Sequence, residues 1–292
     1  MSKLLSPRRT RAARVGALVV LLLAATLSLV PAPATAADPD PVMVEVRGRG
    51  WGHGRGLGQY GAQGYALDQG RDSAWILDHF YGGTTAGRVP GNSPVDPSGI
   101  RVELRGQRGD ALTVGLASGT ITALTPGGEP LRARMEGAVR LSSVNGGVRL
   151  ETADSCTATE WTERFTSGHV VVDLVSTSGD AGRNGRLRVC ADDGSSIWYP
   201  GKLRFHADLV RTVNVTTVEN YLRGVVPAEV PASWQSAALE AQAVAARSYA
   251  LAGDTRQQPY ADTCDTTLCQ VYRGWFRQSS KGEAVGRSTH PA

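Results

Sequence analysis

Glu229 is the residue whose surroundings best fit acid–base chemistry. It stands between two prolines, at 227 and 231, and its other close neighbours in the sequence are Val225, Val226, Val230 and Trp234. An apolar surround disfavours the charged carboxylate, so we expect a raised pKa and a carboxyl that acts as a general acid near neutral pH. A helix-capping carboxylate at the start of the following helix is the alternative, and the residues leave both open.

A glycine-rich stretch offers a second candidate site. Residues 48–58 have Gly at every second position, so in an extended chain one side is bare backbone that another group can approach closely. His53 projects from the other side, as a substrate contact or as a hydrogen-bonded structural histidine. Tyr60 is a candidate for stacking on a sugar ring or for a place in the core. Residues 56–61 also match the dinucleotide pattern G-x-G-x-x-G, but no βαβ unit with an acidic ribose ligand follows, so we expect no nucleotide.

Both helices and strands must position these residues. We expect a strand at 42–46, a helix at 59–67, a second helix capped by Asp72 or Ser73, and a buried alanine-rich helix at 232–251. Short β-like runs separated by Gly, Asn, Asp and Ser occur at 100–104, 112–116, 139–141, 148–150, 169–175, 186–190, 203–205 and 212–217. The predicted class is α+β, with a β-rich module, short N-terminal helices and the alanine-rich helix at a groove.

Composition limits the class of protein. The chain has 292 residues, 41% hydrophobic, and its 35 glycines argue against a helical bundle while the apolar fraction suffices for a core. Residues 1–36 hold five basic residues and no acidic one, so removing them takes the net charge from +4 to −1. The positive net charge of the full chain is therefore no sign of nucleic-acid binding.

The first 36 residues are typical of a secretory signal peptide. Basic residues precede an apolar run at 15–30, and Ala34 and Ala36 fit the small-x-small rule for cleavage. An uncleaved anchor is the alternative, although 16 apolar residues fall short of the roughly 20 that a spanning helix needs. We predict an exported protein with a linker and first strand at 37–47, the glycine motif and helices at 48–99, a β module at 100–199 and a last region at 200–292.

Four cysteines in an exported chain predict two disulfides. Proximity in sequence favours Cys156 with Cys190 and Cys264 with Cys269, although four cysteines permit three connectivities. A metal site at Cys264 and Cys269 would need two further ligands, and no histidine lies between or beside them. We expect neither a metal nor a cofactor.

Three motifs closely resemble the SpoIID/LytB family, which comprises stage II sporulation protein D, a peptidoglycan lytic transglycosylase, and the amidase enhancers. They are YLRGVVPAEVPASW at 221–234, ALEAQAVAARSYAL at 238–251 and CDTTLCQVY at 264–272. A fourth motif is GHGRGLGQYGA at 52–62. The resemblance covers 48–83 and about 200–275, and the intervening β module matches only loosely.

The resemblance implies a catalytic role for Glu229. A lytic route uses the C6 hydroxyl of N-acetylmuramic acid as the nucleophile, so one carboxyl can act first as acid and then as base. Candidates for substrate binding, from the matching motif positions, are His53, Gln59, Tyr60, Arg247, Tyr249, Gln270 and Tyr272. The implied partners are peptidoglycan glycan strands outside the cytoplasm. A glycan-binding module that stimulates a cell-wall amidase is the alternative function.

The chain departs from the family pattern in two ways. The Gly-His-Gly motif precedes the β module here, whereas in the sporulation members it comes near the C-terminus. This chain also stops twenty residues beyond Tyr272, whereas family members continue there with further strands and a Ser-Gly-Gly segment. A shortened product is one interpretation, under which the core would lack strands and activity would be impaired.

Overall fold

The structure is a computed structural model that describes residues 55–87, 99–107, 109, 111–116, 119–176, 186–191, 195–252 and 258–275. These residues belong to one compact unit that begins at Gly54. The predicted signal peptide, the strand at 42–46 and His53 lie outside the described residues. None of the helices in the described part has the length and apolar character of a membrane span.

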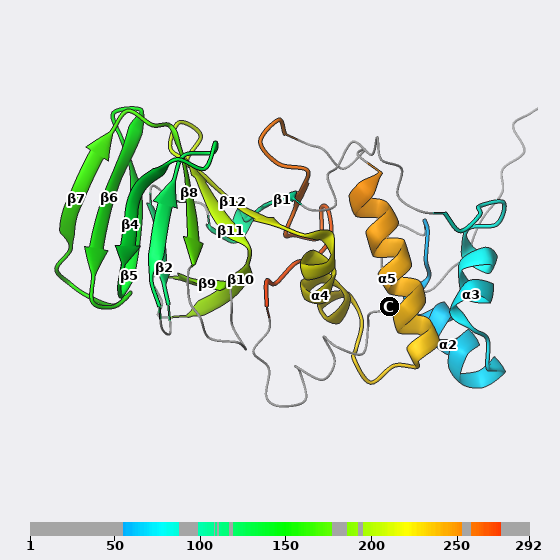
Figure 1. Cartoon of the computed structure of the whole chain (residues 1–292). Coiled ribbons are helices and arrows are strands. Elements are labelled where there is room, and N and C mark those ends of the chain that lie inside the picture. Colours follow the sequence, from blue (N-terminus) through cyan, green and yellow to red (C-terminus); the bar gives the residue numbers. More distant parts are fainter. Residues whose placement is uncertain are drawn as a thin grey trace, which may run out of the picture. The chain divides into compact units, whose positions relative to one another are not determined.

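Thirteen strands in the described residues form two sheets (Figure 1). The first has the order β13-β1-β12-β11-β8-β3-β4, and all its pairs are antiparallel except β1 with β13. Its strands are β1 (Ile100–Glu103), β3 (Ile121–Leu124), β4 (Pro130–Met135), β8 (Val171–Ser176), β11 (Lys202–His206), β12 (Arg211–Thr216) and β13 (Thr263–Cys264). The second sheet has the order β10-β9-β2-β5-β6-β7. Its strands are β2 (Ala111–Gly115), β5 (Ala138–Val144), β6 (Gly147–Ala153), β7 (Thr162–Ser167), β9 (Arg186–Cys190) and β10 (Ser196–Pro200).

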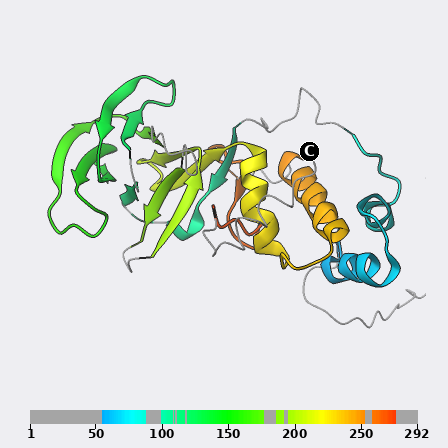
Figure 2. The ribbon, with the colours of Figure 1, turned by 60° about the horizontal axis from the view of Figure 1, so that its bottom comes forward.

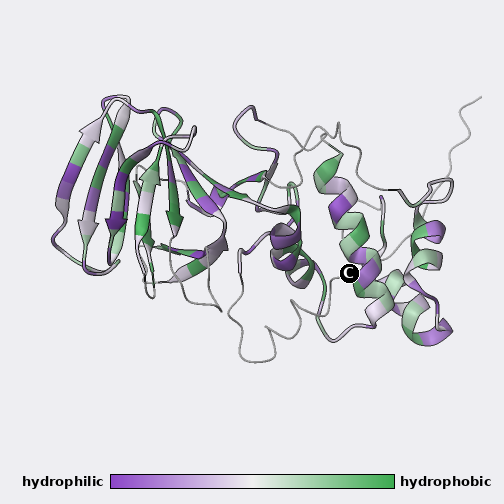
Figure 3. Cartoon of the chain, viewed as in Figure 1, coloured by the Kyte–Doolittle hydropathy of each residue, from purple (hydrophilic) through white to green (hydrophobic). Residues whose placement is uncertain are grey.

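Alternation of apolar and polar residues explains how the sheets pack. In β11, Leu203 and Phe205 are buried while the residues between and beside them are half-exposed, and β9 alternates in the same way. The banding along several strands is visible in Figure 3. Because successive side chains of a strand point to opposite faces, both sheets turn an apolar face inward and form one shared core. The expected β-rich α+β class is confirmed.

Helix α5 (Ser236–Leu251) lies between α4 (Val218–Glu229) on one side and α2 (Gln59–Gln69) and α3 (Ser73–Phe80) on the other (Figures 1 and 2). Its small side chains let the helices on both sides pack close to it. Ala238 and Ala241 pack in a cluster with residues of α2 and α3, whereas Leu239 and Ala243 pack with residues of α4. One hydroxyl also joins the helices, since Ser73 donates to Glu240 Oε2 at 2.9 Å.

Several local predictions are confirmed and others are wrong. The cap at Asp72 is confirmed, because its carboxylate accepts the Trp75 N–H at 2.7 Å. The alanine-rich helix begins four residues later than expected, and a separate helix, α4, precedes it. Strands β3, β4, β7, β10 and β13 were not predicted. Helix α4 was missed because Val225, Val226, Gly224 and Pro227 have low helix propensity, and packing of its apolar face on the core overrides that preference.

Candidate functional site

Glu229 is the last residue of α4. The helix begins at a Thr217 cap, whose side-chain oxygen accepts the Asn220 N–H, and it ends where Val230 turns extended. The alternative of a capping carboxylate at a helix start is therefore wrong. The C-terminal end of a helix carries partial negative charge, so a carboxylate here gains nothing from the helix dipole. Its position needs another explanation, which its contacts supply.

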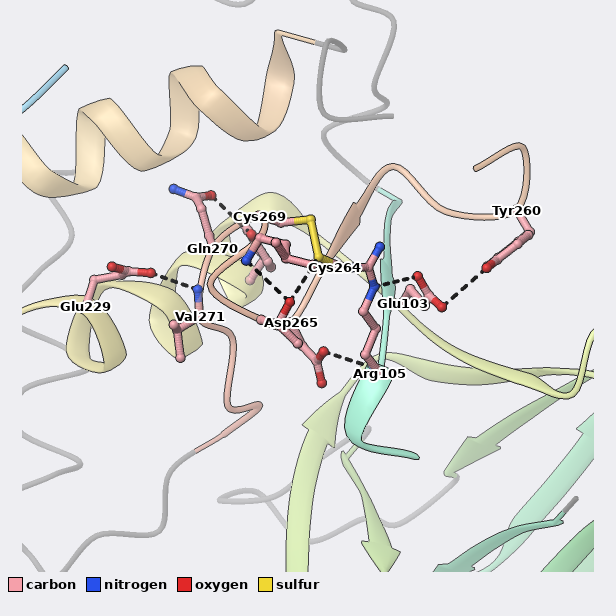
Figure 4. Close-up of a disulfide and its surroundings, with 12 residues drawn as sticks. Glu103, Arg105, Glu229, Tyr260, Cys264, Asp265, Cys269, Gln270 and Val271 are labelled. Atoms are coloured by element: carbon pink, nitrogen blue, oxygen red, sulfur yellow. Dashed lines mark hydrogen bonds and ion pairs between the residues drawn. A yellow bond between two sulfur atoms is a disulfide. The ribbon is translucent and has the colours of Figure 1, made fainter. Parts of the chain in front are cut away.

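Three segments that are far apart in the sequence meet at the Glu229 carboxylate. Oε1 accepts the main-chain N–H of Val271 at 2.7 Å, and Oε2 accepts from Gln59 Nε2 at 3.4 Å. Figure 4 shows the first of these bonds. The side chain is half-buried. The structure thus joins the end of α4, the first residue of α2 and the segment after the second disulfide at one carboxyl group.

The cysteine loop holds Val271 in place. Cys264 lies in β13 beside β1, and the disulfide to Cys269 closes the loop directly before Gln270 and Val271 (Figure 4). Asp265 donates its N–H to the Glu103 carbonyl at 3.1 Å and accepts the Arg105 N–H on its carboxylate at 2.9 Å. The loop is therefore fixed to β1 on one side and to the disulfide on the other.

Burial acts on two groups at this loop, the Asp265 carboxyl and the Tyr221 hydroxyl. Burial raises the pKa of Asp265, and main-chain N–H donors, Arg105 among them, act in the opposite direction. Gln270 accepts the buried hydroxyl of Tyr221 on Oε1 at 3.1 Å. Burial also raises the pKa of Tyr221, so this hydroxyl remains a donor throughout the neutral range. Gln270 is thereby attached to α4, one residue away from the N–H that binds Glu229.

The first turn of α2 brings an exposed aromatic residue to the α4–α5 connection. Tyr60 is 81% exposed, and its ring centroid lies 5.2 Å from that of Trp234 in an edge-on arrangement. One turn later, Gln63 Oε1 accepts the N–H of Gln235 at 2.9 Å. Gln59 and Tyr60, both predicted as site residues, are thus placed beside the segment that follows Glu229.

Two other predicted residues lie on α5. Arg247 forms an ion pair with Glu219, in the first turn of α4, and the second contact of that pair measures 3.3 Å. Ten residues separate Glu219 from Glu229, about 15 Å along the helix. Tyr249 is 38% exposed, and burial of part of its side chain raises its pKa. Substrate contact by Arg247 and Tyr249 stays a prediction.

The prediction that Tyr272 binds substrate needs correction. Its side chain is only 2% exposed, and its hydroxyl donates to Asn214 Oδ1 at 2.7 Å. The rings of Tyr199 and Tyr221 lie 5.9 and 5.1 Å away. Tyr272 is a core residue that packs under the segment carrying Val271, so it acts on the site only through its neighbours.

The four cysteines form two disulfides, Cys156–Cys190 and Cys264–Cys269, the pairs that sequence proximity predicted. Both sulfurs of the second pair are used by the disulfide, so neither is a thiolate ligand. Within the described ranges, no group of three or more His, Cys, Asp or Glu side chains could hold a metal ion.

Sequence reasoning missed the contribution of Val271. It supplies a main-chain N–H, which every residue except proline possesses, so its residue type carries no signal. Tyr221 was also missed as a site residue, although it lies within the first motif. Its spacing from Glu229 gives no hint that its hydroxyl reaches Gln270.

Comparison with known proteins identifies the segment that holds this carboxylate. Residues 207–290 match the family model SpoIID, described as stage II sporulation protein. Through this segment the chain is similar to the SpoIID/LytB family. The SpoIID match includes α4, α5 and the cysteine loop, and therefore Glu229, but it does not include Gln59 or Tyr60.

Two curated proteins are similar to parts of this chain. An uncharacterized protein of Brachyspira hyodysenteriae is 37% identical over 102 residues, which are 33% of this chain and 27% of that protein. The amidase enhancer of Bacillus subtilis is 45% identical over 64 residues, 22% of this chain and 8% of that protein. The chain thus spans about a quarter of the first and under a tenth of the second. No solved structure matches it significantly.

Proposed function

We propose that this protein cleaves the glycan strands of peptidoglycan by a lytic route, with Glu229 as acid and then base. One observation carries the proposal: the Glu229 carboxylate is the point where the N–H of Val271 and the amide of Gln59 converge from separate motifs. Such convergence orients a carboxyl group that a helix terminus alone does not favour. The match of residues 207–290 to the SpoIID family supports a role at the cell wall.

The reaction needs only one carboxyl group. The Glu229 O–H gives its proton to the glycosidic oxygen that joins N-acetylmuramic acid to N-acetylglucosamine, and the bond from C1 to that oxygen breaks with its electron pair on the oxygen. The ionised carboxylate then takes the proton of the C6 hydroxyl while O6 bonds to C1. The products are a 1,6-anhydro end and a strand with a new hydroxyl, and the acid is restored.

Aromatic residues beside the carboxylate suit a glycan substrate. Tyr60 exposes most of its ring and contacts Trp234, so together they offer an apolar surface next to Glu229. Sugar rings present C–H faces that pack on such surfaces, and the tyrosine hydroxyl can bind a sugar hydroxyl. We assign sugar binding to Tyr60, with His53 as a further candidate.

We further propose that the protein works outside the cytoplasm. It has two disulfides, and disulfides persist in oxidising compartments and are rare in the cytosol. The basic and apolar segment at 1–36 supports export.

A second candidate function is stimulation of a cell-wall amidase. The observation that favours it is the name of the Bacillus subtilis relative, the amidase enhancer, which is 45% identical over the matched 64 residues. In that function the same surface would hold glycan without breaking it, and Glu229 would accept hydrogen bonds from sugar hydroxyls.

Mass spectrometry of digested glycan strands, with and without stem peptides, tests the proposal. The mature protein should produce 1,6-anhydromuramic ends, and Glu229→Gln should reduce their formation by at least ~100-fold, because a positioned acid–base group contributes about that much or more. Glu240→Gln is the matched control, since this carboxylate accepts its hydrogen bond from Ser73 of α3, and it should retain activity.

Two results would count against cleavage. Full turnover by folded Glu229→Gln would remove the acid–base assignment. Failure of the folded wild-type protein to form any product, together with faster stem-peptide release when it is added to a purified cell-wall amidase, would favour the enhancer function instead.

A further inference from the structure

The two oxygens of the Glu229 carboxyl have partners of different chemical character. Oε1 faces the main-chain N–H of Val271, which can only donate a hydrogen bond. Oε1 is therefore held as an acceptor whether the group is ionised or protonated, and the exchangeable proton belongs on Oε2. Oε2 faces the side-chain amide of Gln59, which has both a donor and an acceptor.

We propose that Gln59 is a positioning residue that orients Glu229 in both of its protonation states. When the carboxyl is ionised, the amide N–H of Gln59 donates to Oε2. When it is protonated, a half-turn of the amide lets Gln59 Oε1 accept a hydrogen bond from the O–H at Oε2, until the glycosidic oxygen of a substrate replaces Gln59 as the acceptor. This inference rests on the proposed function, in which Glu229 must be an acid in one step and a base in the next.

The fold gives Gln59 the fixed position that such a role requires. It is the first residue of α2, and Phe80 of α3 packs against Gly58 and Gly61 on either side of it, because a Cβ at each glycine would lie 3.0 Å from the Phe80 ring. Gln59 therefore reaches the carboxyl from an element that is anchored independently of it.

Gln59 and Gln63 make a matched pair for the test. Both lie on α2, and both join it to the α4–α5 region, but only Gln59 contacts Glu229. Methionine has a similar length and no amide. We expect Gln59→Met to lower kcat by ~10-fold or more on peptide-free glycan strands, as expected for loss of a hydrogen bond to a charged group. KM should change little, and Gln63→Met should stay close to the wild type.

The pH dependence adds a readout that a purely structural role would not affect. Gln59→Glu places a second carboxyl beside Oε2, and two carboxyls so close resist ionising together. The activity of this variant should therefore peak at a higher pH than that of the wild type. Independently of activity, carbon-13 NMR of the Glu229 carboxyl should show a changed chemical shift in Gln59→Met and an unchanged one in Gln63→Met.

Each alternative has its own outcome. A raised KM with unchanged kcat in Gln59→Met would show that Gln59 contacts substrate instead of orienting Glu229. Equal behaviour of the two methionine variants in kinetics and NMR would overturn the inference. A wild-type protein without lytic activity would refute the proposed function, and the NMR comparison would still decide whether Gln59 orients the Glu229 carboxyl.

Discussion

Tyrosines around the candidate site differ in what their hydroxyl groups contact. Tyr60 is mostly exposed at the start of α2, whereas Tyr272 is enclosed by two other tyrosines and donates to Asn214. Burial raises the pKa of Tyr272 well above its usual range, so its hydroxyl stays a donor at every physiological pH. At the residue scale, one tyrosine is available to a ligand and the other supports the backbone near Val271.

Tyr272→Phe tests this assignment. The change leaves Asn214 Oδ1 without its buried donor, so we expect the free energy of unfolding to fall by about 1–3 kcal/mol. Turnover by the folded variant should remain near that of the wild type. Urea denaturation and product formation measure the two effects, and Tyr249→Phe, at a more exposed tyrosine, is the control with little loss of stability. Lost turnover at unchanged stability would restore a substrate-binding role for Tyr272.

At the scale of elements, α4 meets the segment after the cysteine loop through a glycine. A Cβ added at Gly224 would lie 2.5 Å from Tyr272 Cε2 and closer still to the Gly274 carbonyl oxygen. The Arg273 N–H donates to the Gly224 carbonyl at 3.4 Å across the same contact. The absence of a side chain at Gly224 lets α4 and residues 271–274 approach closely enough for Glu229 to reach Val271.

Gly224→Ala should therefore destabilise the protein, although alanine is the better helix former. Alanine in a helix gains about 1 kcal/mol over glycine, but the overlap with Tyr272 and Gly274 should cost about 1–3 kcal/mol more than that gain. Gly64→Ala in α2 is the control with the opposite sign, because its Cβ would meet only Asp68 Oδ2, at 3.8 Å. Thermal unfolding of both variants decides the matter, and a stabilised Gly224→Ala would contradict the close packing.

At the scale of the whole molecule, stability should depend on the protonation of a histidine in the seven-stranded sheet. Burial, with Arg204 as the next cause, lowers the pKa of His206. Its Nε2 has no hydrogen-bond partner within the described part of the chain, and the Tyr260 ring lies 5.5 Å away. The other charged groups that act on it are Asp208, Asp173 and Arg101. The folded protein therefore binds this proton more weakly than the unfolded chain does.

Acidification should weaken the fold through His206. The unfolded chain takes up the proton at about pH 6.5, so the His206 contribution is complete above that pH and declines as the pH falls toward the folded-state pKa. Asp265, whose pKa is raised, contributes the opposite slope, because its folded form keeps a proton that the unfolded chain releases. Only the difference between wild type and His206→Asn isolates the histidine.

Urea denaturation from pH 7.5 to 5 measures this difference. Wild type should lose up to ~1.4 kcal/mol per pH unit relative to His206→Asn over that interval. His169→Asn, at an exposed histidine, should follow the wild-type curve. Parallel curves for wild type and His206→Asn would show that the histidine is not held neutral by the fold.

The sequence alone determined the features that depend on local pattern and residue type. Alternation and turn residues predicted many of the strands, Asp72 predicted a helix cap, and cysteine proximity predicted both disulfide pairs. The motif around Glu229 indicated the family through its residue types and their order. These predictions held because periodicity, capping and short-range covalent closure depend on neighbours in the chain.

Only the tertiary structure decided what surrounds Glu229. Helix α4 forms against its own low propensity because the core takes up its apolar face, and this puts Glu229 at a helix end instead of a helix start. The partners of the carboxylate, Gln59 and Val271, are 170 and 42 residues away in the sequence. Tyr272 matched a motif position yet lies in the core. Contacts of this kind arise from packing between distant segments, and residue type and spacing in one sequence do not encode which segments will meet.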